Sequence, residues 1–319
     1  MTIIAGIDEA GYGPVLGPLV ISVVALDVPD DKANCSLWDL LKDAISDGLH
    51  GRKQRLAVCD SKKLYSTRNG VKPLEDAVMS FLGVKGVKIA SFYQLLDSLS
   101  CFDREVIDGY PWYTQKDYAL PFATSEAVFV NYIDLLQHSL AKHGIRFSHA
   151  ASCVVAVREV NEQVRSCGNK STVLFNNSIK HVAKLLKESN GNVELLIDKQ
   201  GGRNTYSHLL QKYFPGKEIK ILGESSEVSS YVIFGKKRSI KISFAEKGET
   251  VSLAAALASI FSKYIRELFM VLENQYWLQL LPGLKPTAGY YTDAQRYLSQ
   301  IEQMRQEKGI CDDILIRIK

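Results

Sequence analysis

The sequence predicts an α/β protein in which a mixed β-sheet is flanked by helices. Apolar, β-branched runs in the first half are bounded by glycines and acids, as expected of antiparallel strands. In the second half, short strand-like runs alternate with amphipathic stretches that predict helices. At 319 residues, the chain is long enough for one large domain or two small ones.

The first half contains short apolar runs and two amphipathic stretches. The apolar runs predict strands at Thr2–Ile7, Pro18–Asp27, Val84–Tyr93 and Ala151–Glu159. The amphipathic stretches predict helices at Ser36–His50 and Ser125–His143.

The next part of the chain has clearer helix and strand boundaries. A helix over Val173–Glu188 is expected to stop at Asn190-Gly191, and the strand Val193–Ile197 ends on Asp198. The remaining elements are a helix over Thr205–Phe214, a strand over Glu218–Leu222 and a hairpin over Val228–Phe244 that turns at Gly235-Lys236.

A long helix is predicted from about Glu249. Five apolar residues on it are spaced by three or four positions and share one face: Leu253, Leu257, Ile260, Tyr264 and Leu268. A loop from Pro282 and a polar helix from Asp293 to about Glu307 complete the chain.

Composition excludes several classes of protein. No apolar stretch is long enough to span a bilayer, and Met1 to Ile7 lack the basic start of a signal peptide. The six cysteines form no CxxC pair, which indicates reduced thiols and a cytoplasmic protein. The net charge of +4 is compatible with a polyanionic partner without indicating one.

Four acidic residues stand at positions where chemistry is often found. Asp8-Glu9 follow a buried strand and precede Gly11 and Gly13, which allow the backbone to bend so that both carboxylates converge. Asp198 ends another strand, and Glu249 stands near the start of the long helix. A solvated turn, a turn aspartate and an acid that offsets a helix dipole explain the same residues without function.

Clustering of these acids would require bound cations. Two unit charges 4 Å apart repel by about 4 kcal/mol at an effective dielectric constant of 20. Several such pairs would rival the roughly 5–15 kcal/mol that stabilises a whole domain. Carboxylate oxygens favour Mg²⁺ or Mn²⁺ over zinc.

Five segments in order resemble the motifs of the ribonuclease HII family, over residues 6 to about 293. They are Asp8-Glu9-Ala10-Gly-x-Gly-Pro, Asp60-Ser61-Lys62-Lys63-Leu64, Asp198 after its strand, Glu249 nine residues before Ala258-Ser259-Ile260, and Ala288-Gly289-Tyr290. The resemblance implies a ribonuclease H-like fold with a mixed five-stranded sheet flanked by helices and carrying insertions.

The resemblance also implies an endonuclease that hydrolyses the RNA strand of RNA/DNA hybrids by a two-metal-ion mechanism, leaving 5′-phosphate and 3′-hydroxyl ends. Its catalytic and metal-binding residues would be Asp8, Glu9, Asp198 and Glu249, with Mg²⁺ or Mn²⁺. The substrate-binding residues would be Gly11, Tyr12, Gly13, Ser61, Lys62, Lys63, Arg203 and Tyr290. The expected partner is a hybrid or a ribonucleotide-containing duplex, bound by a monomer with no membrane association.

Tyr12 and Glu246 mark departures from the typical family member. Tyr12 stands where an arginine is usual, which favours cleavage within RNA runs over excision of single ribonucleotides. Glu246 competes with Glu249 as the fourth acid, and Glu249 is favoured by its spacing to the Ala-Ser-Ile segment.

The greater length suggests extra parts around a catalytic core. We expect a core over residues 1–275 with an insertion at 92–147, and a loop and helix over 276–319 that contribute to substrate binding. The aromatics Tyr110, Trp112 and Tyr113 could stack on bases, although core packing is the expected role. Two other functions stay open: a nuclease of the same fold that acts on other nucleic acids, and a catalytically inactive hybrid-binding protein.

Overall fold

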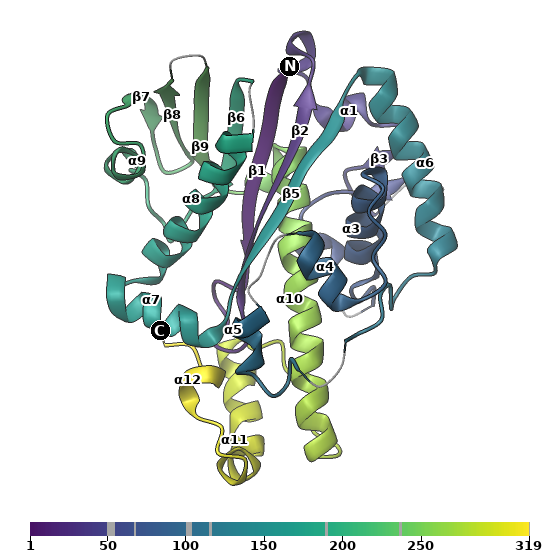
Figure 1. Ribbon diagram of the computed structural model, residues 1–319, viewed down its shortest axis with the longest axis vertical. Helices are drawn as coiled ribbons and strands as arrows, with labels where there is room; N and C mark the ends of the chain where they lie inside the picture. The colour runs from purple at the N-terminus through teal and green to yellow at the C-terminus, as the bar shows by residue number, and fades with distance from the viewer. Residues whose placement is uncertain are drawn as a thin grey trace.

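The chain folds around one seven-stranded sheet (Figure 1). The computed structural model describes residues 1–49, 55–66, 68–99, 104–114, 117–188, 191–235 and 238–318. Across the sheet the strands are β5 (Arg146–Val155), β2 (Leu19–Val28), β1 (Thr2–Ala10), β6 (Val193–Asp198), β9 (Ser239–Ala245), β8 (Val228–Phe234) and β7 (Glu218–Glu224). The predicted α/β class with a mixed sheet is confirmed. The sheet has seven strands rather than five, because the antiparallel strands β8 and β7 extend it beyond β9.

Strand β1 lies at the centre of the sheet, antiparallel to β2 and parallel to β6. In the register of β1 and β6, Ile7 lies beside Ile197. Because parallel neighbours have their carboxyl ends at the same edge of a sheet, the residues that follow meet there. That edge carries Asp8 and Asp198.

Helices cover both faces of the sheet, as Figure 1 shows. One face packs against the long helix α10 (Leu253–Leu280), with α3 (Lys72–Val84) and α6 (Glu126–His143) beside it. The other face packs mainly against α8 (Lys170–Glu188) and α9 (Ser207–Tyr213). Each face has its own hydrophobic core, so the central strand β1 is held from both sides.

Helix α10 approaches strand β1 closely at Gly6. A Cβ atom added at Gly6 would lie 2.1 Å from the backbone nitrogen of Ala255, far inside van der Waals contact. Only glycine therefore allows this approach. The same helix is tied to the strand end by the Ser262 hydroxyl, which donates to the carbonyl oxygen of Asp8 at 2.9 Å.

Most of the predicted elements of the second half are confirmed, but the start of the long helix is wrong. Helix α10 begins at Leu253, after Ser252, whose side chain accepts a hydrogen bond from the backbone of Ala255. This N-cap sets the first helical residue. Glu249 lies before it, in the short 3₁₀ helix η2 (Gly248–Thr250).

Two predictions in the first half are wrong. The helix expected over Ser36–His50 stops early: α1 (Leu37–Leu40) is short, and Ile45–Ser46 forms a strand, β3, that pairs parallel to β4 (Leu56–Ala57). This pairing of β-branched Ile45 overrides the helical spacing. His50 lies outside the described residues, as do Asn190 and Lys236 of the predicted turns.

The strand expected over Val84–Tyr93 is also absent from the structure of these residues. Helix α3 runs to Val84, the chain turns at Gly86 with a φ of 75°, and α4 (Phe92–Ser98) follows. The left-handed glycine ends the helix, which an alternating apolar pattern does not reveal.

The strand predicted for Ala151–Glu159 has different boundaries. Strand β5 ends at Val155, and α7 (Val157–Cys167) begins where the Glu159 side chain accepts a hydrogen bond from the backbone of Ala156. A side chain that caps the helix start therefore converts the end of the predicted strand into helix.

The aromatic residues near position 112 belong to the core. Tyr110, Trp112 and Tyr113 are each only 2% exposed, and Trp112 packs with Trp277 of α10. They are therefore not available to stack on bases, which confirms the packing role. Cys35, Cys59, Cys153, Cys167 and Cys311 are free thiols, and Cys101 lies outside the described residues. In the described part of the chain, no helix is both long and apolar enough to cross a membrane.

Candidate metal centre

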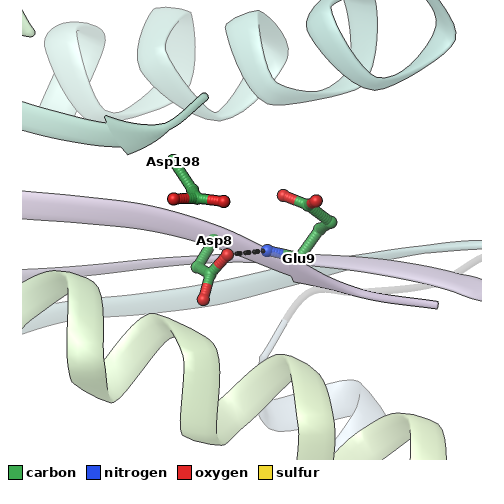
Figure 2. Close-up of side chains that lie close together, drawn as sticks. All are labelled: Asp8, Glu9 and Asp198. Atoms are coloured by element: carbon green, nitrogen blue, oxygen red, sulfur yellow. Dashed lines mark hydrogen bonds between the residues drawn. The ribbon is translucent and has the colours of Figure 1, made fainter. Parts of the chain in front are cut away.

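Three carboxylates meet at the carboxyl edge of β1 and β6. One carboxylate oxygen from each of Asp8, Glu9 and Asp198 lies within 4.8 Å of the other two (Figure 2). The antiparallel pairing of β1 with β2 continues to Ala10, so no bend in the strand brings the two neighbouring acids together. Instead, the Asp8 carboxylate accepts a hydrogen bond from the backbone nitrogen of Glu9 at 2.8 Å. The expected convergence thus occurs, but through side-chain orientation rather than through the glycines.

The proximity and burial of these acids raise their pKa values. Burial, followed by the charges of Asp198 and Glu249, raises the pKa of Asp8 to about 8. Burial and the charge of Glu249 raise the pKa of Asp198 to about 6. Burial and the charges of Asp8 and Asp198 hold the pKa of Glu9 well above its usual range. Without a cation, the cluster therefore retains protons at neutral pH.

Glu249 reaches the same site from η2. Its side chain lines the cleft beside Asp8 and Asp198, and its charge acts on the pKa of both. Glu246, three residues earlier, is exposed and is not among the described residues that line the cleft. The geometry therefore favours Glu249 as the fourth acid, although it stands before α10 rather than on it.

The segment Asp60–Leu64 lies across the cleft from the sheet edge. Asp60 caps the short helix α2 (Ser61–Leu64), and the hydroxyl groups of Ser61 and Ser259 lie 2.9 Å apart. Lys62 lines the cleft. Partial burial alone would lower the pKa of Lys62, but the charges of Asp60, Asp8, Glu249 and Asp198 raise it above its usual value. Lys63 is exposed and does not line the cleft.

Residues Gly11–Pro14 and Tyr290 form another wall of the cleft. Gly11 has a φ of 92°, and a Cβ atom there would lie 2.8 Å from Nε of Arg266. The ring of Tyr290 lies 4.0 Å from the position that a Cβ atom of Gly13 would occupy. Tyr290 is 54% exposed, so its ring is accessible at the mouth of the cleft. It precedes helix α11 (Tyr291–Glu307), which begins two residues earlier than predicted.

Tyr12 lies in the cleft and is within reach of the charges of Glu9 and Arg203. The pKa of Tyr12 is raised by burial and by the charge of Glu9, and is lowered by the charge of Arg203. Arg203 donates to the Ser171 hydroxyl at 3.0 Å and stacks over the ring of Tyr206, 5.8 Å from its centroid. Tyr12 lines the cleft, whereas Arg203 does not. The structure therefore does not bring Arg203 to the predicted substrate site.

Several residues of the cleft were not predicted as site residues. They are Ala10, Pro14, Asp60, Lys247, Ser259, Lys263 and Arg266. Lys263 and Arg266 follow Ser259 by four and seven residues, so helical periodicity could have placed them on its face of α10. Lys247 gave no such signal, because its position depends on a left-handed backbone with a φ of 56°.

The cleft has the chemistry of a site for hard divalent cations. Its volume is about 330 Å³, and the carboxylates of Asp8, Glu9, Asp198 and Glu249 line it together with Asp60, which caps α2. No histidine or cysteine of the described residues lines it. An all-oxygen donor set fits Mg²⁺ or Mn²⁺ and not structural zinc. The raised pKa values fit as well, since a bound cation offsets the mutual repulsion of the acids.

No protein-family model and no curated protein matches the chain. Solved structures do match it. The RNase HII of Archaeoglobus fulgidus, solved in complex with PCNA, has 14% identity and a TM-score of 0.42, over 99% of this chain and 94% of that one. The ribonuclease H2 of Pyrococcus horikoshii OT3 has 15% identity and a TM-score of 0.43, over 98% and 92%.

A third structure, Bst-RNase HIII in complex with Mn²⁺, has 14% identity and a TM-score of 0.44, over 99% of this chain and 66% of that one. The TM-scores of all three lie below 0.5. The chain is similar over nearly its whole length to solved structures of ribonucleases HII and HIII, and the motifs in its sequence resemble those of the ribonuclease HII family.

Proposed function

We propose that the chain is a metal-dependent endoribonuclease that hydrolyses the RNA strand of RNA/DNA hybrids. The observation that carries this proposal is that one carboxylate oxygen from each of Asp8, Glu9 and Asp198 lies within 4.8 Å of the other two, with Asp8 buried. At such separations two ionised carboxylates repel by about 4 kcal/mol at an effective dielectric constant of 20. Keeping such mutually repelling carboxylates together is explained by a function that needs bound divalent cations rather than by a contribution to stability.

The four acids would hold Mg²⁺ or Mn²⁺ between them. Bound in pairs at such sites, these cations lower the pKa of the attacking water and stabilise the leaving oxygen of an in-line displacement. Products of this reaction carry 5′-phosphate and 3′-hydroxyl ends. Asp8 retains a proton in the metal-free protein, so it would release that proton when it becomes a ligand.

The other residues of the cleft suit a nucleic acid strand. Lys62 presents an ammonium group beside the acids, where it can bind the phosphate next to the scissile one. The backbone of Gly13 is open to close approach, and the exposed ring of Tyr290 lies beside it. A backbone amide together with an aromatic face can recognise a ribose through its 2′-hydroxyl.

The proposal also assigns catalysis and substrate binding to different parts of the chain. Residues 1–275 would form the catalytic core, within which the segment 92–147 is an insertion whose aromatics pack in the core. Residues 276–319 would contribute Tyr290 to substrate binding. We also propose that cleavage falls within RNA runs, because Tyr12 replaces the usual arginine and cannot fork onto a phosphate.

The test uses labelled duplexes with Mg²⁺ or Mn²⁺, with and without EDTA. We expect metal-dependent cleavage of a hybrid with a long RNA run, slower cleavage at a single embedded ribonucleotide, and none of an all-DNA duplex. Asp8→Asn and Asp198→Asn serve as inactive controls. Equal cleavage of the all-DNA duplex would favour a nuclease for other nucleic acids, and tight binding without cleavage would favour a hybrid-binding protein.

A further inference from the structure

The loop Pro14–Gly17, directly behind the glycines of the cleft, is held by distant parts of the chain. The backbone nitrogens of Val15 and Leu16 donate to the carbonyl oxygen of Gly289, at 2.8 and 3.3 Å. Arg266 of α10 donates to the carbonyl oxygen of Leu16 at 3.4 Å. The conformation of this loop is therefore set by residues that lie more than 200 positions away.

A third contact comes from the segment 312–318. The backbone nitrogen of Arg317 donates to the carbonyl oxygen of Val15 at 2.8 Å, and its guanidinium group donates to that of Pro14. Arg317 is only 3% exposed. One buried residue thus satisfies two consecutive carbonyl groups of the loop, which would otherwise be buried without a partner.

The segment 312–318 is itself anchored to α7 by Asn161. The amide nitrogen of Asn161 donates to the carbonyl oxygens of Asp313 and Ile316, at 3.2 and 2.9 Å. Its amide oxygen accepts from the backbone nitrogen of Ile318 at 2.9 Å. Asn161 is 1% exposed, so the anchor is rigid and protected from water.

Arg317 also lies in a buried charged cluster with α10. The charges of Arg266 and Glu273 both act on Arg317, and Glu273 is 1% exposed. Arg266 in turn underlies Gly11 and donates to the carbonyl oxygen of Ala288 at 2.9 Å. The loop, the helix and the segment before Tyr290 are therefore connected through two buried arginines.

We infer that Arg317 is a positioning residue, which fixes Gly11–Gly13 beside Tyr290 so that the loop can distinguish ribose from deoxyribose. This inference rests on the proposed function. Hydrogen bonds to a 2′-hydroxyl hold only over a few tenths of an ångström, so a loop that moves would lose the discrimination. Lysine cannot replace arginine fully, because the guanidinium is a fixed planar donor and the ammonium is not.

The first experiment measures the loop without any substrate. Hydrogen exchange of Val15 and Leu16 is compared in the wild type, Arg317→Met and Arg317→Lys. We expect exchange about tenfold faster in Arg317→Met, with a smaller increase in Arg317→Lys. If Arg317→Met fails to fold, Arg317→Lys carries the test.

Arg146→Met is the matched control, because it removes the same charge at the end of the sheet opposite the acids. Arg146 pairs with Asp27 and makes none of the contacts described for the loop or for the segment 312–318. Exchange of Val15 and Leu16 should match the wild type in this control. Unchanged exchange in both Arg317 variants, or equal acceleration in Arg146→Met, would overturn the positioning role.

The second experiment measures discrimination with hybrid and all-DNA duplexes. In Arg317→Met we expect KM for the hybrid to rise about tenfold while kcat changes less than about twofold, with partial rescue in Arg317→Lys. A merely structural defect would instead lower kcat through the fraction of folded enzyme. An unchanged KM would overturn the role in discrimination. If the wild-type protein does not cleave hybrids, the proposed function is wrong. The hydrogen exchange experiment uses no substrate, so it would still test whether Arg317 holds the loop.

Discussion

The hydroxyl groups of Ser61 and Ser259 lie 2.9 Å apart and join α2 to α10 beneath the acidic cleft. The Ser259 hydroxyl also donates to the carboxylate of Asp8, which lowers the pKa of that acid against the effect of burial. A short chain of hydrogen bonds therefore runs from the lysine-bearing helix to the most buried acid of the site.

Ser259→Ala should weaken divalent cation binding. Loss of the donated hydrogen bond leaves Asp8 easier to protonate, and loss of a residue that supports a metal ligand typically lowers affinity about 10–100-fold. Calorimetric titration with Mn²⁺ at pH 7 measures the change. Ser61→Ala, one hydrogen bond further from Asp8, should have a smaller effect. Equal Mn²⁺ affinities in the wild type and both variants would contradict a role for these hydrogen bonds.

Asp198→Asn should abolish cleavage and stabilise the metal-free protein. A folded pKa raised from 3.8 to about 6 means that the folded state binds more protons than the unfolded one between these values, so stability falls as pH rises through this window. Above pH 6 the cost is about 3 kcal/mol, at 1.36 kcal/mol for each pKa unit. Thermal unfolding at pH 7.5 should show a higher Tm for the variant. The difference should vanish near pH 4, and a lower Tm at pH 7.5 would contradict the assignment.

Cation affinity should rise with pH. The pKa values of about 8 for Asp8 and about 6 for Asp198 mean that protons must leave before these carboxylates can bind a metal. We expect Mn²⁺ affinity to increase from about pH 5 to about pH 8 and to level off above it. Titrations in two buffers of different ionisation enthalpy would detect the protons released, and binding without proton release would argue against the raised pKa values.

Glu249→Gln and Glu246→Gln separate the two candidates for the fourth acid. Glu249 lines the cleft, whereas Glu246 is exposed outside it. Loss of a ligand to a catalytic cation should lower kcat at least about 100-fold in Glu249→Gln. Glu246→Gln should retain wild-type cleavage of the hybrid. Loss of cleavage in Glu246→Gln but not in Glu249→Gln would identify Glu246 as the fourth acid instead.

Tyr290→Ala should raise KM for the hybrid about tenfold. The reason is the loss of one aromatic stacking contact, which contributes roughly 1–3 kcal/mol to binding. Tyr291→Ala offers a matched control, because Tyr291 is similarly exposed but does not line the cleft. Steady-state cleavage of the hybrid measures both. Equal effects of the two substitutions would show that the contact with Gly13 has no special role.

The sequence placed Asp8, Glu9 and Asp198 at the ends of two predicted strands, but it did not show that the two strand ends meet. Their convergence was expected only from the resemblance to the ribonuclease HII family. The spacing to the Ala-Ser-Ile segment favoured Glu249 over Glu246. The pattern of apolar residues did not predict that Glu249 lies in a short 3₁₀ helix before α10. Ser252 is the N-cap of α10, so the helix begins at Leu253 and Glu249 lies in the separate short helix η2.

The strand and helix predictions that were wrong lie where contacts between distant residues override the local pattern of apolar residues. The alternating apolar residues after Val84 predict a strand, yet Gly86 turns the chain and Val87 packs against the core. Likewise, Ile45 pairs with Leu56 in a ladder that helical spacing does not anticipate. Arg317 had no signal at all, since its partners at Pro14 and Val15 are known only from the folded chain.

The absence of a side chain at Gly6 has a consequence for genetics as well as for structure. Any larger residue there must push α10 away from β1, and with it Ser259 and Ser262, which both bind Asp8. A search for inactivating mutations should therefore recover Gly6 as readily as the acids, although it has no functional group. Added metal should not rescue such an allele, because its defect is the displaced helix.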